Sequence, residues 1–321
     1  MKEFELIRQI QRETSASYST GFEHGVKLGI GDDAAVLEVP AGHYLVAATD
    51  TLNAGTHFPV NTSPFDIGYK CLAVNLSDLA AMGAVPRWAL LSLSLPEAAP
   101  EWVHLFSEGF NSLAKPHNVT LVGGDTTSGP LSISLTALGI IEPGRQLTRS
   151  GANPGDLVVV SGTIGGAAHA LKMLQAGKPV TEQHLLDRPQ PRVSLGQCLA
   201  GKASACIDIS DGLLADLGHV LRASACSASI EIEKLPQTDV LAALEDETRW
   251  NYQLSGGDDY ELLFTLPCQH KGWLETWRQQ LDIRLSVIGE IESGEGVRCL
   301  AKDGGHYHPR GTGFEHFRRQ P

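Results

Sequence analysis

The sequence predicts an α/β protein with two domains, in which short strands alternate with amphipathic helices. Three observations support this expectation. The chain has 321 residues, enough for two sizeable cores. Its hydrophobic content is 42% with 34 glycines, a composition typical of a loop-rich globular protein. Strand-type and helix-type hydrophobic patterns also alternate along its length.

The charge and cysteine content narrow the class of protein. The formal net charge is −12, from 25 basic and 37 acidic residues, so general nucleic-acid binding is not expected. No apolar run approaches the roughly 18 residues that span a bilayer, and the first residues lack a signal core. The six cysteines show no CxxC pairing. We therefore expect a cytoplasmic protein with reduced thiols and no membrane partner.

The first half of the chain alternates clear helix and strand patterns. Apolar residues on one helical face, or alternating with polar residues, identify each element. Asp66 is expected to cap the second helix. The patterns predict helices over 2–12, 66–82 and 100–114, and strands that end at Asp50 or cover 89–95, 119–122 and 133–139.

A segment rich in proline and glycine, from Glu142 to Gly155, predicts a domain boundary near residue 145. The expected domains are therefore 1–145 and 146–321. The second half predicts strands at 157–160, up to Ile209, and at 229–232, 262–266 and 285–291, with helices up to about Ala176 and at 193–202, 213–223 and 270–281.

Acidic residues recur at the ends of apolar runs, beside glycine, serine or threonine. The first are the adjacent Asp32 and Asp33 in the segment Gly31-Asp-Asp-Ala-Ala. The others are Asp50, Asp78, Asp125, Asp208, Asp211, Asp258 and Asp259. Any one of them is a plausible turn or cap residue, but carboxylates repel one another. Their repetition at expected strand–helix junctions in both halves favours Mg²⁺, which binds hard oxygen ligands together with phosphates.

Other nucleotide-binding motifs fit less well. Residues 29–34 match the GxGxxA form of the dinucleotide fingerprint, but Asp32 and Asp33 would face a pyrophosphate and no strand is predicted before them. The chain contains no GxxxxGK[ST] sequence and no HRD or DFG set, which excludes P-loop and protein-kinase sites. His57, near Asp50, and Arg149, at the domain boundary, are candidates for substrate and phosphate contacts, although such loop residues are often simply exposed. Residues 313–317 suit either a terminal strand or an aromatic wall.

Taken together, the motifs resemble a known superfamily. Gly31-Asp-Asp-Ala, Ala48-Thr-Asp-Thr, Asn75-Leu-Ser-Asp-Leu and Gly123-Gly-Asp-Thr are similar to the ATP-binding half of aminoimidazole ribonucleotide synthetase-like proteins. Within that superfamily, Thr56-His-Phe, Leu147-Thr-Arg-Ser, Asp208-Ile-Ser-Asp-Gly, Ser255-Gly-Gly-Asp-Asp and Gly313-Phe-Glu-His-Phe resemble the thiamine-monophosphate kinases. The resemblance implies phosphorylation of thiamine monophosphate by ATP to give thiamine diphosphate.

The resemblance also assigns roles to individual residues. Several Mg²⁺ ions would be held by Asp32, Asp33, the Ala48 carbonyl, Thr49, Asp50, Asp78, Asp125, Asp208 and Asp211. ATP would lie along Gly124, Asp125, Arg149 and Ser210, and thiamine monophosphate would face His57, Asp258 and Phe314. The family usually has glutamate where this chain has Asp258, and tryptophan or tyrosine in place of Phe314.

The implied chemistry needs no general base, because the acceptor phosphate is already ionised at neutral pH; the expected reaction is direct in-line transfer with metal assistance. The resemblance further implies a homodimer whose N-terminal sheets form a shared barrel, and a C-terminal α/β sandwich. Three other enzymes of the superfamily remain alternatives: selenophosphate synthetase, aminoimidazole ribonucleotide synthetase and a hydrogenase-maturation dehydratase. The first would carry a reactive cysteine near its start, whereas the first cysteine here is Cys71. A silent nucleotide-binding protein is the remaining alternative.

Overall fold

The computed structural model describes residues 3–15, 25–311, 313 and 314, with the backbone alone at 3, 4 and 15. The chain forms two compact units. The first comprises Met1–Leu79 and Ala84–Gly144, and the second comprises Ala80–Gly83 and Arg145–Pro321. Each unit has its own sheet and helices, so the predicted two-domain architecture of mixed α/β type is confirmed.

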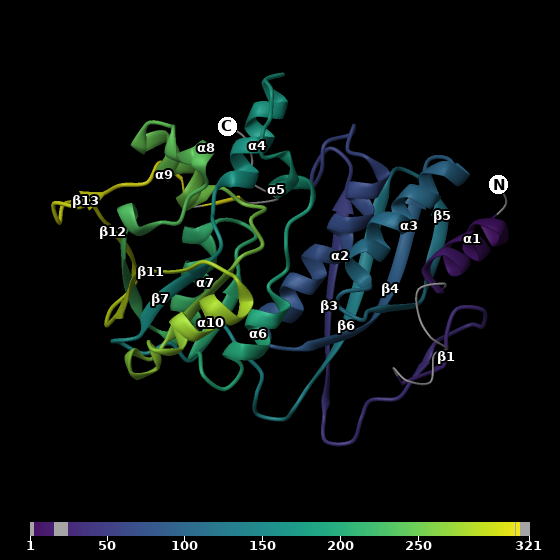
Figure 1. Ribbon diagram of the computed structural model, residues 1–321, viewed down its shortest axis with the longest axis horizontal. Helices are drawn as coiled ribbons and strands as arrows, with labels where there is room; N and C mark the ends of the chain where they lie inside the picture. Colours follow the sequence, from purple (N-terminus) through teal and green to yellow (C-terminus); the bar gives the residue numbers. More distant parts are fainter. Residues whose placement is uncertain (1–2, 16–24, 312, 315–321) are drawn as a thin grey trace. The chain divides into compact units, whose positions relative to one another are not determined.

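The first unit is built on a four-stranded sheet with the order β3-β6-β4-β5, in which only β4 and β5 run parallel. Helices α2 and α3 cover one face of this sheet (Figure 1). The helices are α1 (Glu3–Ser15), α2 (Pro64–Ala81) and α3 (Pro100–Ala114). The strands are β1 (Val26–Leu28), β2 (Val36–Leu37), β3 (Tyr44–Asn53), β4 (Val85–Leu95), β5 (Thr120–Ser128) and β6 (Ser132–Ile141).

The two faces of this sheet carry different cores. Alternation along β4 buries Leu91, Leu93 and Leu95 on the helix-covered face. On the other face, the β1–β2 hairpin packs against a cluster that includes Trp88 and Val122. The sequence predicted the β4 strand but not this hairpin, because its strands are only three and two residues long.

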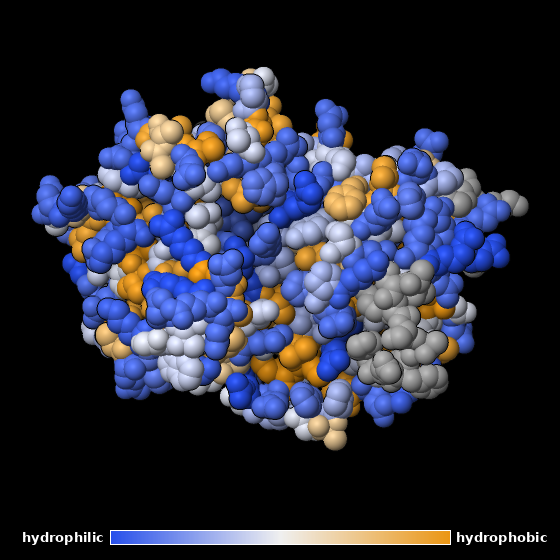
Figure 2. All heavy atoms as spheres, viewed as in Figure 1, coloured by the Kyte–Doolittle hydropathy of each residue, from blue (hydrophilic) through white to orange (hydrophobic). Residues whose placement is uncertain are grey.

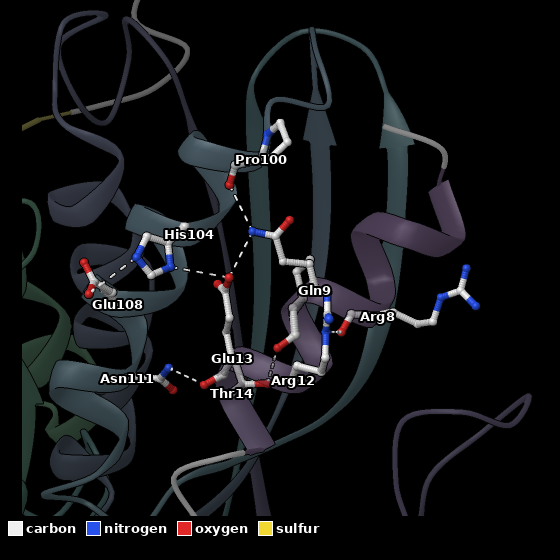
Figure 3. A network of polar contacts seen from close by, with 10 residues as sticks. Arg8, Gln9, Arg12, Glu13, Thr14, Pro100, His104, Glu108 and Asn111 are labelled. Carbon is white, nitrogen blue, oxygen red and sulfur yellow. Dashed lines mark hydrogen bonds and ion pairs between the residues drawn. The ribbon is translucent and has the colours of Figure 1, made fainter.

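Helix α1 is fixed to α3 by a polar network (Figure 3). Gln9 Nε2 donates a hydrogen bond to the Pro100 carbonyl at 3.0 Å, and Asn111 Nδ2 donates to the Glu13 carbonyl at 3.0 Å. The Glu13 carboxylate also lies 3.4 Å from His104 Nδ1. These contacts extend the helix to Ser15, beyond the predicted end at residue 12.

Helix α2 begins with a serine cap. Ser63 Oγ accepts a hydrogen bond from the Asp66 backbone N–H at 3.1 Å and donates to Asp66 Oδ2 at 2.6 Å. The expectation that Asp66 is the cap is therefore wrong: Ser63 occupies the cap position, and Asp66 is its partner three residues later.

The second unit contains a seven-stranded sheet with the order β13-β12-β9-β11-β7-β10-β8, in which only β12 and β9 run parallel. The strands are β7 (Leu157–Ser161), β8 (Ala205–Asp208), β9 (Ser227–Glu231), β10 (Leu262–Leu266), β11 (Leu285–Glu292), β12 (Gly296–Leu300) and β13 (His306–Tyr307). The α-helices are α4 (Gly166–Gln175), α5 (Gln183–Asp187), α6 (Val193–Leu199), α7 (Leu213–Ser224), α8 (Asp239–Ala242), α9 (Asp246–Ser255) and α10 (Trp273–Leu281), with short 3₁₀ turns at Ile232–Lys234 and Cys268–His270.

The acidic residues do not all occupy the strand–helix junctions that the sequence suggested. Asp50 lies within β3, because the ladder to β6 continues as far as Asn53. Asp78 lies within α2, and Asp125 lies within β5. Asp208 does end a strand, β8, and Asp211 lies between β8 and the helix α7.

Hydrophilic side chains predominate on the face of the molecule in Figure 2. Among the residues that the structure describes, no helix is long and apolar enough to span a bilayer. All six cysteines are free thiols, and four of them are buried.

Candidate active site

In the first unit, two predicted metal ligands meet between β3 and α2. The Asp50 and Asp78 side chains share a hydrogen bond, and His57 lies close enough to act on Asp50 electrostatically. Burial raises the pKa of Asp50, while the bond with Asp78 and the nearby His57 lower it. His57 Nδ1 accepts a hydrogen bond from the Asn53 N–H at 3.0 Å, which holds the ring on its loop. The structure thus brings Asp50, Asp78 and His57 together.

The neighbouring predicted ligands on β3 point differently. Successive side chains on a strand face opposite sides of the sheet, so Thr49 lies on the other face from Asp50. Thr49 Oγ1 donates to the Leu135 carbonyl at 3.1 Å and accepts from Thr136 Oγ1 at 3.1 Å. Ala48 has the same orientation as Asp50 along the strand. The Asp50 and Thr49 side chains therefore cannot converge on one ion from the same face.

A second group of predicted residues surrounds a cavity of about 920 Å³ in the same unit. Asp32 and Asp33 line it together with Gly124, and α1 contributes Arg8 and Gln11. Gln11 Nε2 donates to the Ile30 carbonyl at 2.9 Å, which ties α1 to the acidic loop. A smaller hollow of about 90 Å³ shares Gly124 and is lined by Asp125.

The two groups lie toward opposite edges of the four-stranded sheet. Asp50 is paired with Leu135, which is paired with Leu91, which in turn is paired with Gly124. Three strand spacings separate Asp50 from Gly124, a distance of about 14 Å. Gly124 has a φ of +151°, and a Cβ there would lie 1.8 Å from the Leu91 carbonyl oxygen. Only glycine allows the two parallel strands to approach in this way.

In the second unit, the turn from Asp208 to Gly212 is organised around a carboxylate that the sequence analysis did not single out. Asp216 Oδ2 accepts hydrogen bonds from the backbone N–H groups of Ser210, Asp211 and Gly212 at 3.1, 3.1 and 3.2 Å. Burial, followed by the nearby Asp208 and Asp211 carboxylates, raises the pKa of Asp216 to about 7, although the bonds from the Asp211 and Ser210 N–H groups lower it. A carboxylate four residues after a Gly that precedes a helix is the signal that could have identified it.

The loop from Gly256 to Glu261 is joined to this turn by backbone hydrogen bonds. Asp258 N–H donates to the Ser210 carbonyl at 2.9 Å, and Tyr260 N–H donates to the Ile209 carbonyl at 2.8 Å. Asp258 and Tyr260 both have left-handed conformations, with φ of 70° and 51°, which are uncommon outside glycine. Tyr260 Oη also donates to Asp258 Oδ1 at 3.2 Å. The strained conformation is thus held by bonds on both its backbone and its side chains.

Phe314 joins the same cluster, because its backbone N–H donates to the Asp211 carbonyl at 2.9 Å. Phe314 is 52% exposed. The structure therefore brings together Asp208, Ser210, Asp211, Asp258 and Phe314, predicted separately as metal, nucleotide and substrate contacts. The rest of the expected segment, residues 315–317, lies outside the described residues.

Two further acidic residues of this loop are structural: Glu261 is buried and Asp259 is half-buried. Both oxygens of Asp259 accept hydrogen bonds from the Gly165 N–H, at 3.0 and 2.8 Å, at the start of α4. Burial raises the pKa of Asp259 well above its usual value, despite these bonds. Glu261 accepts from Arg192 Nε at 2.7 Å and from Ser161 Oγ at 2.5 Å. This network fixes the end of the loop that carries Asp258.

Arg149 lies on the same side of the second unit as Asp211. Both residues affect the pKa of His219 on α7. Burial is the main cause that lowers this pKa, and the charges of Arg222 and Arg149 lower it further. The Asp211 carboxylate raises it. The Arg149 carbonyl accepts a hydrogen bond from Ser224 Oγ at 3.3 Å, which places the segment before β7 against α7.

The donor chemistry of these groups fits Mg²⁺. Asp50 and Asp78 hold two carboxylates in direct contact, and Asp208 and Asp211 bring two more to one turn, where the Asp216 carboxylate is already occupied by backbone N–H groups. Within the described ranges, no group of three or more His, Cys, Asp or Glu side chains is close enough to hold a metal without other ligands. That arrangement suits Mg²⁺, which is commonly bound by one or two carboxylates and completed by water and substrate phosphates.

Comparison with known proteins is consistent with this geometry. The family model for the N-terminal domain of AIR synthase related proteins matches residues 31–141, and that for the C-terminal domain matches residues 153–302. The thiamine-monophosphate kinase of Escherichia coli K12 is 43% identical over 300 residues, which covers 91% of this chain and 92% of the relative. The chain belongs to the thiamine-monophosphate kinase family.

Other members of the family match over nearly the whole length. The thiamine-monophosphate kinase of Haemophilus influenzae is 41% identical, and the alignment covers 99% of this chain and 98% of the Haemophilus protein. The crystal structure of the Stenotrophomonas maltophilia kinase has a TM-score of 0.85 with 46% identity, covering 95% of this chain and 97% of that one. A structure of AaThiL complexed with AMPPCP and TMP has a TM-score of 0.75 with 33% identity, covering 97% and 96%. The hydrogenase maturation protein HypE, at 18% identity and a TM-score of 0.77, shares the fold.

Proposed function

We propose that this thiamine-monophosphate kinase family member transfers the γ-phosphoryl group of ATP to thiamine monophosphate. A phosphate oxygen of thiamine monophosphate forms the new bond to the γ-phosphorus, the bond to the β–γ bridging oxygen breaks, and thiamine diphosphate and ADP result. The observation that carries the proposal is the cluster of Asp208, Ser210, Asp211, Asp258 and Phe314, which fits a nucleotide and a thiamine ring, together with family membership over nearly the whole chain.

The residues have distinct roles in this proposal. Asp32, Asp33, Asp50, Asp78 and Asp125 in the first unit, and Asp208 and Asp211 in the second, would hold Mg²⁺, which neutralises the two phosphate chains when bound. Gly124, Arg149 and Ser210 would contact ATP, and the Arg149 guanidinium suits phosphate recognition. His57 and Asp258 would orient thiamine monophosphate, and Phe314 would stack on one of its rings.

No side chain is needed as a general base or as a nucleophile. The acceptor phosphate of thiamine monophosphate carries ionised oxygens at neutral pH, so the attacking atom needs no deprotonation. The chain's contribution is to bind and align two polyanions, which is the main source of rate enhancement in phosphoryl transfer. We therefore propose direct in-line transfer without a phospho-enzyme.

We also propose that the protein is a homodimer that pairs through its N-terminal sheets, and that it works in the cytoplasm, where its free thiols stay reduced. Strand β3 supports the dimer, because it has one described neighbour, β6, and ten residues along its edge. Tyr44 and Leu45 on this strand are 60% and 50% exposed. Sedimentation equilibrium would test the dimer, with Ala47→Pro expected to shift it toward monomer.

The activity is tested by incubating the purified protein with ATP, MgCl₂ and thiamine monophosphate and separating the products by chromatography. Thiamine diphosphate should form from the monophosphate but not from thiamine or from aminoimidazole precursors, which are the controls. The product should disappear with EDTA and in Asp32→Ala. Tight metal-dependent ATP binding without thiamine diphosphate would contradict the proposed substrate.

A further inference from the structure

The turn that carries Asp208, Ser210 and Asp211 has an internal support. Asp216 is the fourth residue of α7, and its carboxylate reaches back over the start of the helix. A single oxygen, Oδ2, accepts the backbone N–H groups of Ser210, Asp211 and Gly212. The side chain is buried, with 3% of its surface exposed.

Convergence of three donors on one oxygen defines the shape of the turn. Consecutive N–H groups that point to one centre form a concave backbone arrangement, which is normally completed by an anion. A carboxylate serves here because it only accepts hydrogen bonds and offers several lone-pair sites. Gly212 is held at a φ of +119°, and Gly257 lies so near that a Cβ on it would be 2.4 Å from the Ser210 carbonyl oxygen.

The same turn supports both segments that carry the substrate contacts. The Ser210 carbonyl accepts the Asp258 N–H at 2.9 Å, and the Asp211 carbonyl accepts the Phe314 N–H at 2.9 Å. The N–H groups of Ser210 and Asp211 point to Asp216 while their carbonyls point to the other two segments. A shift of either peptide unit would therefore move Asp258 and Phe314 as well.

We propose that Asp216 is a positioning residue for phosphoryl transfer: it presets the Asp208–Gly212 turn and, through it, the backbones of Asp258 and Phe314. This inference deepens the proposed function and rests on it. Asp216 contacts neither substrate; it acts by keeping the peptide groups of the turn in the orientation that binds both of them.

Two variants of Asp216 and one control separate positioning from general stability. Asp216→Ala removes the acceptor, and Asp216→Asn keeps one carbonyl oxygen in nearly the same place. The control is Asp156→Ala. Asp156 is also buried in the second unit, and its carboxylate also closes a turn by accepting from the Asn153 N–H at 2.9 Å and from Ser204 Oγ at 2.5 Å. Neither of these hydrogen bonds involves the Asp208–Gly212 turn.

The kinetic constants are measured for each variant well below its own melting temperature. Asp216→Ala is expected to lower kcat by about 10- to 100-fold and to raise KM for thiamine monophosphate, because displacement of supporting groups typically costs this much. Asp216→Asn should recover most of the loss. Asp156→Ala should lose thermal stability but keep kcat and KM within about threefold of wild type.

Hydrogen exchange gives a readout that is independent of turnover. The peptide that spans residues 208–213 should exchange faster in Asp216→Ala, to an intermediate degree in Asp216→Asn, and at the wild-type rate in Asp156→Ala. If Asp216→Ala does not fold, Asp216→Asn carries the test, with faster exchange and a raised KM expected. Wild-type exchange and kinetics in the folded Asp216 variants would overturn the inference. Absence of activity in the wild-type protein would instead contradict the proposed function.

Discussion

Replacement of Arg192 by methionine is expected to destabilise the second unit by about 3–5 kcal/mol, because it leaves a buried carboxylate without its cation. The Glu261 side chain is 7% exposed and the Arg192 side chain 21%. Arg192 donates to both carboxylate oxygens, from Nε at 2.7 Å and also from Nη2. Ser161 Oγ also donates to Glu261 Oε2 at 2.5 Å, but a neutral hydroxyl cannot balance the charge of the carboxylate.

The size of the effect follows from comparing single and double variants. Arg192→Met keeps an apolar stem of similar length, so little of the loss comes from packing. Adding Glu261→Met to Arg192→Met removes the stranded charge, and the double variant should regain at least about 2 kcal/mol relative to the single variant.

Scanning calorimetry is the appropriate assay, since it separates the transitions of the two units. For a domain of about 150–250 residues, 1 kcal/mol shifts the melting temperature by about 2–4 °C. Arg192→Met should therefore lower the transition of the second unit by about 6–20 °C. A shift below about 2 °C, or a double variant no more stable than Arg192→Met, would refute the reasoning.

Three further predictions follow from the described contacts. Asp78→Asn should leave the melting temperature of the metal-free protein nearly unchanged, because the asparagine amide can still donate the hydrogen bond to Asp50, and should abolish the stabilisation that MgATP gives to the wild type. Gly124→Ala should lower the free energy of unfolding of the first unit by more than about 3 kcal/mol, since its Cβ would lie 1.8 Å from a backbone oxygen. Gly42→Ala, at a position with positive φ but open space, should lower it by about 1 kcal/mol. Equal losses of stability in urea unfolding would contradict this. The raised pKa of Asp259 means that the folded state still holds a proton at pH values above about 4, where the unfolded state has released it. The melting temperature should therefore fall as the pH rises from about 4 through the pKa of Asp259 in the folded state. Asp259→Asn should flatten this decline.

Local periodicity was enough to identify most of the elements. The predicted strand at 262–266 coincides with β10, and the helix at 100–114 coincides with α3. Both have strong apolar patterns of the right period. The hairpin of β1 and β2 and the helix α9 were missed, because two or three residues carry no period and α9 has few apolar residues on which to detect one.

The sequence identified acidic residues but could not group them. Asp50 and Asp78 meet because β3 passes beside α2, and Asp32 approaches Gly124 because a loop folds over the opposite edge of the same sheet. These contacts depend on strand order, which short-range patterns do not contain. Asp216 was overlooked for a related reason: its importance lies in three backbone donors that have no side-chain signature.

The most direct test of direct in-line transfer is the stereochemistry at the transferred phosphorus. ATP made chiral at the γ-phosphorus with oxygen isotopes would be converted with thiamine monophosphate, and the configuration of the terminal phosphorus of thiamine diphosphate determined. A single in-line displacement predicts inversion. Retention would require two displacements through a phosphorylated side chain, and would contradict an account in which the protein only binds and aligns the two phosphates.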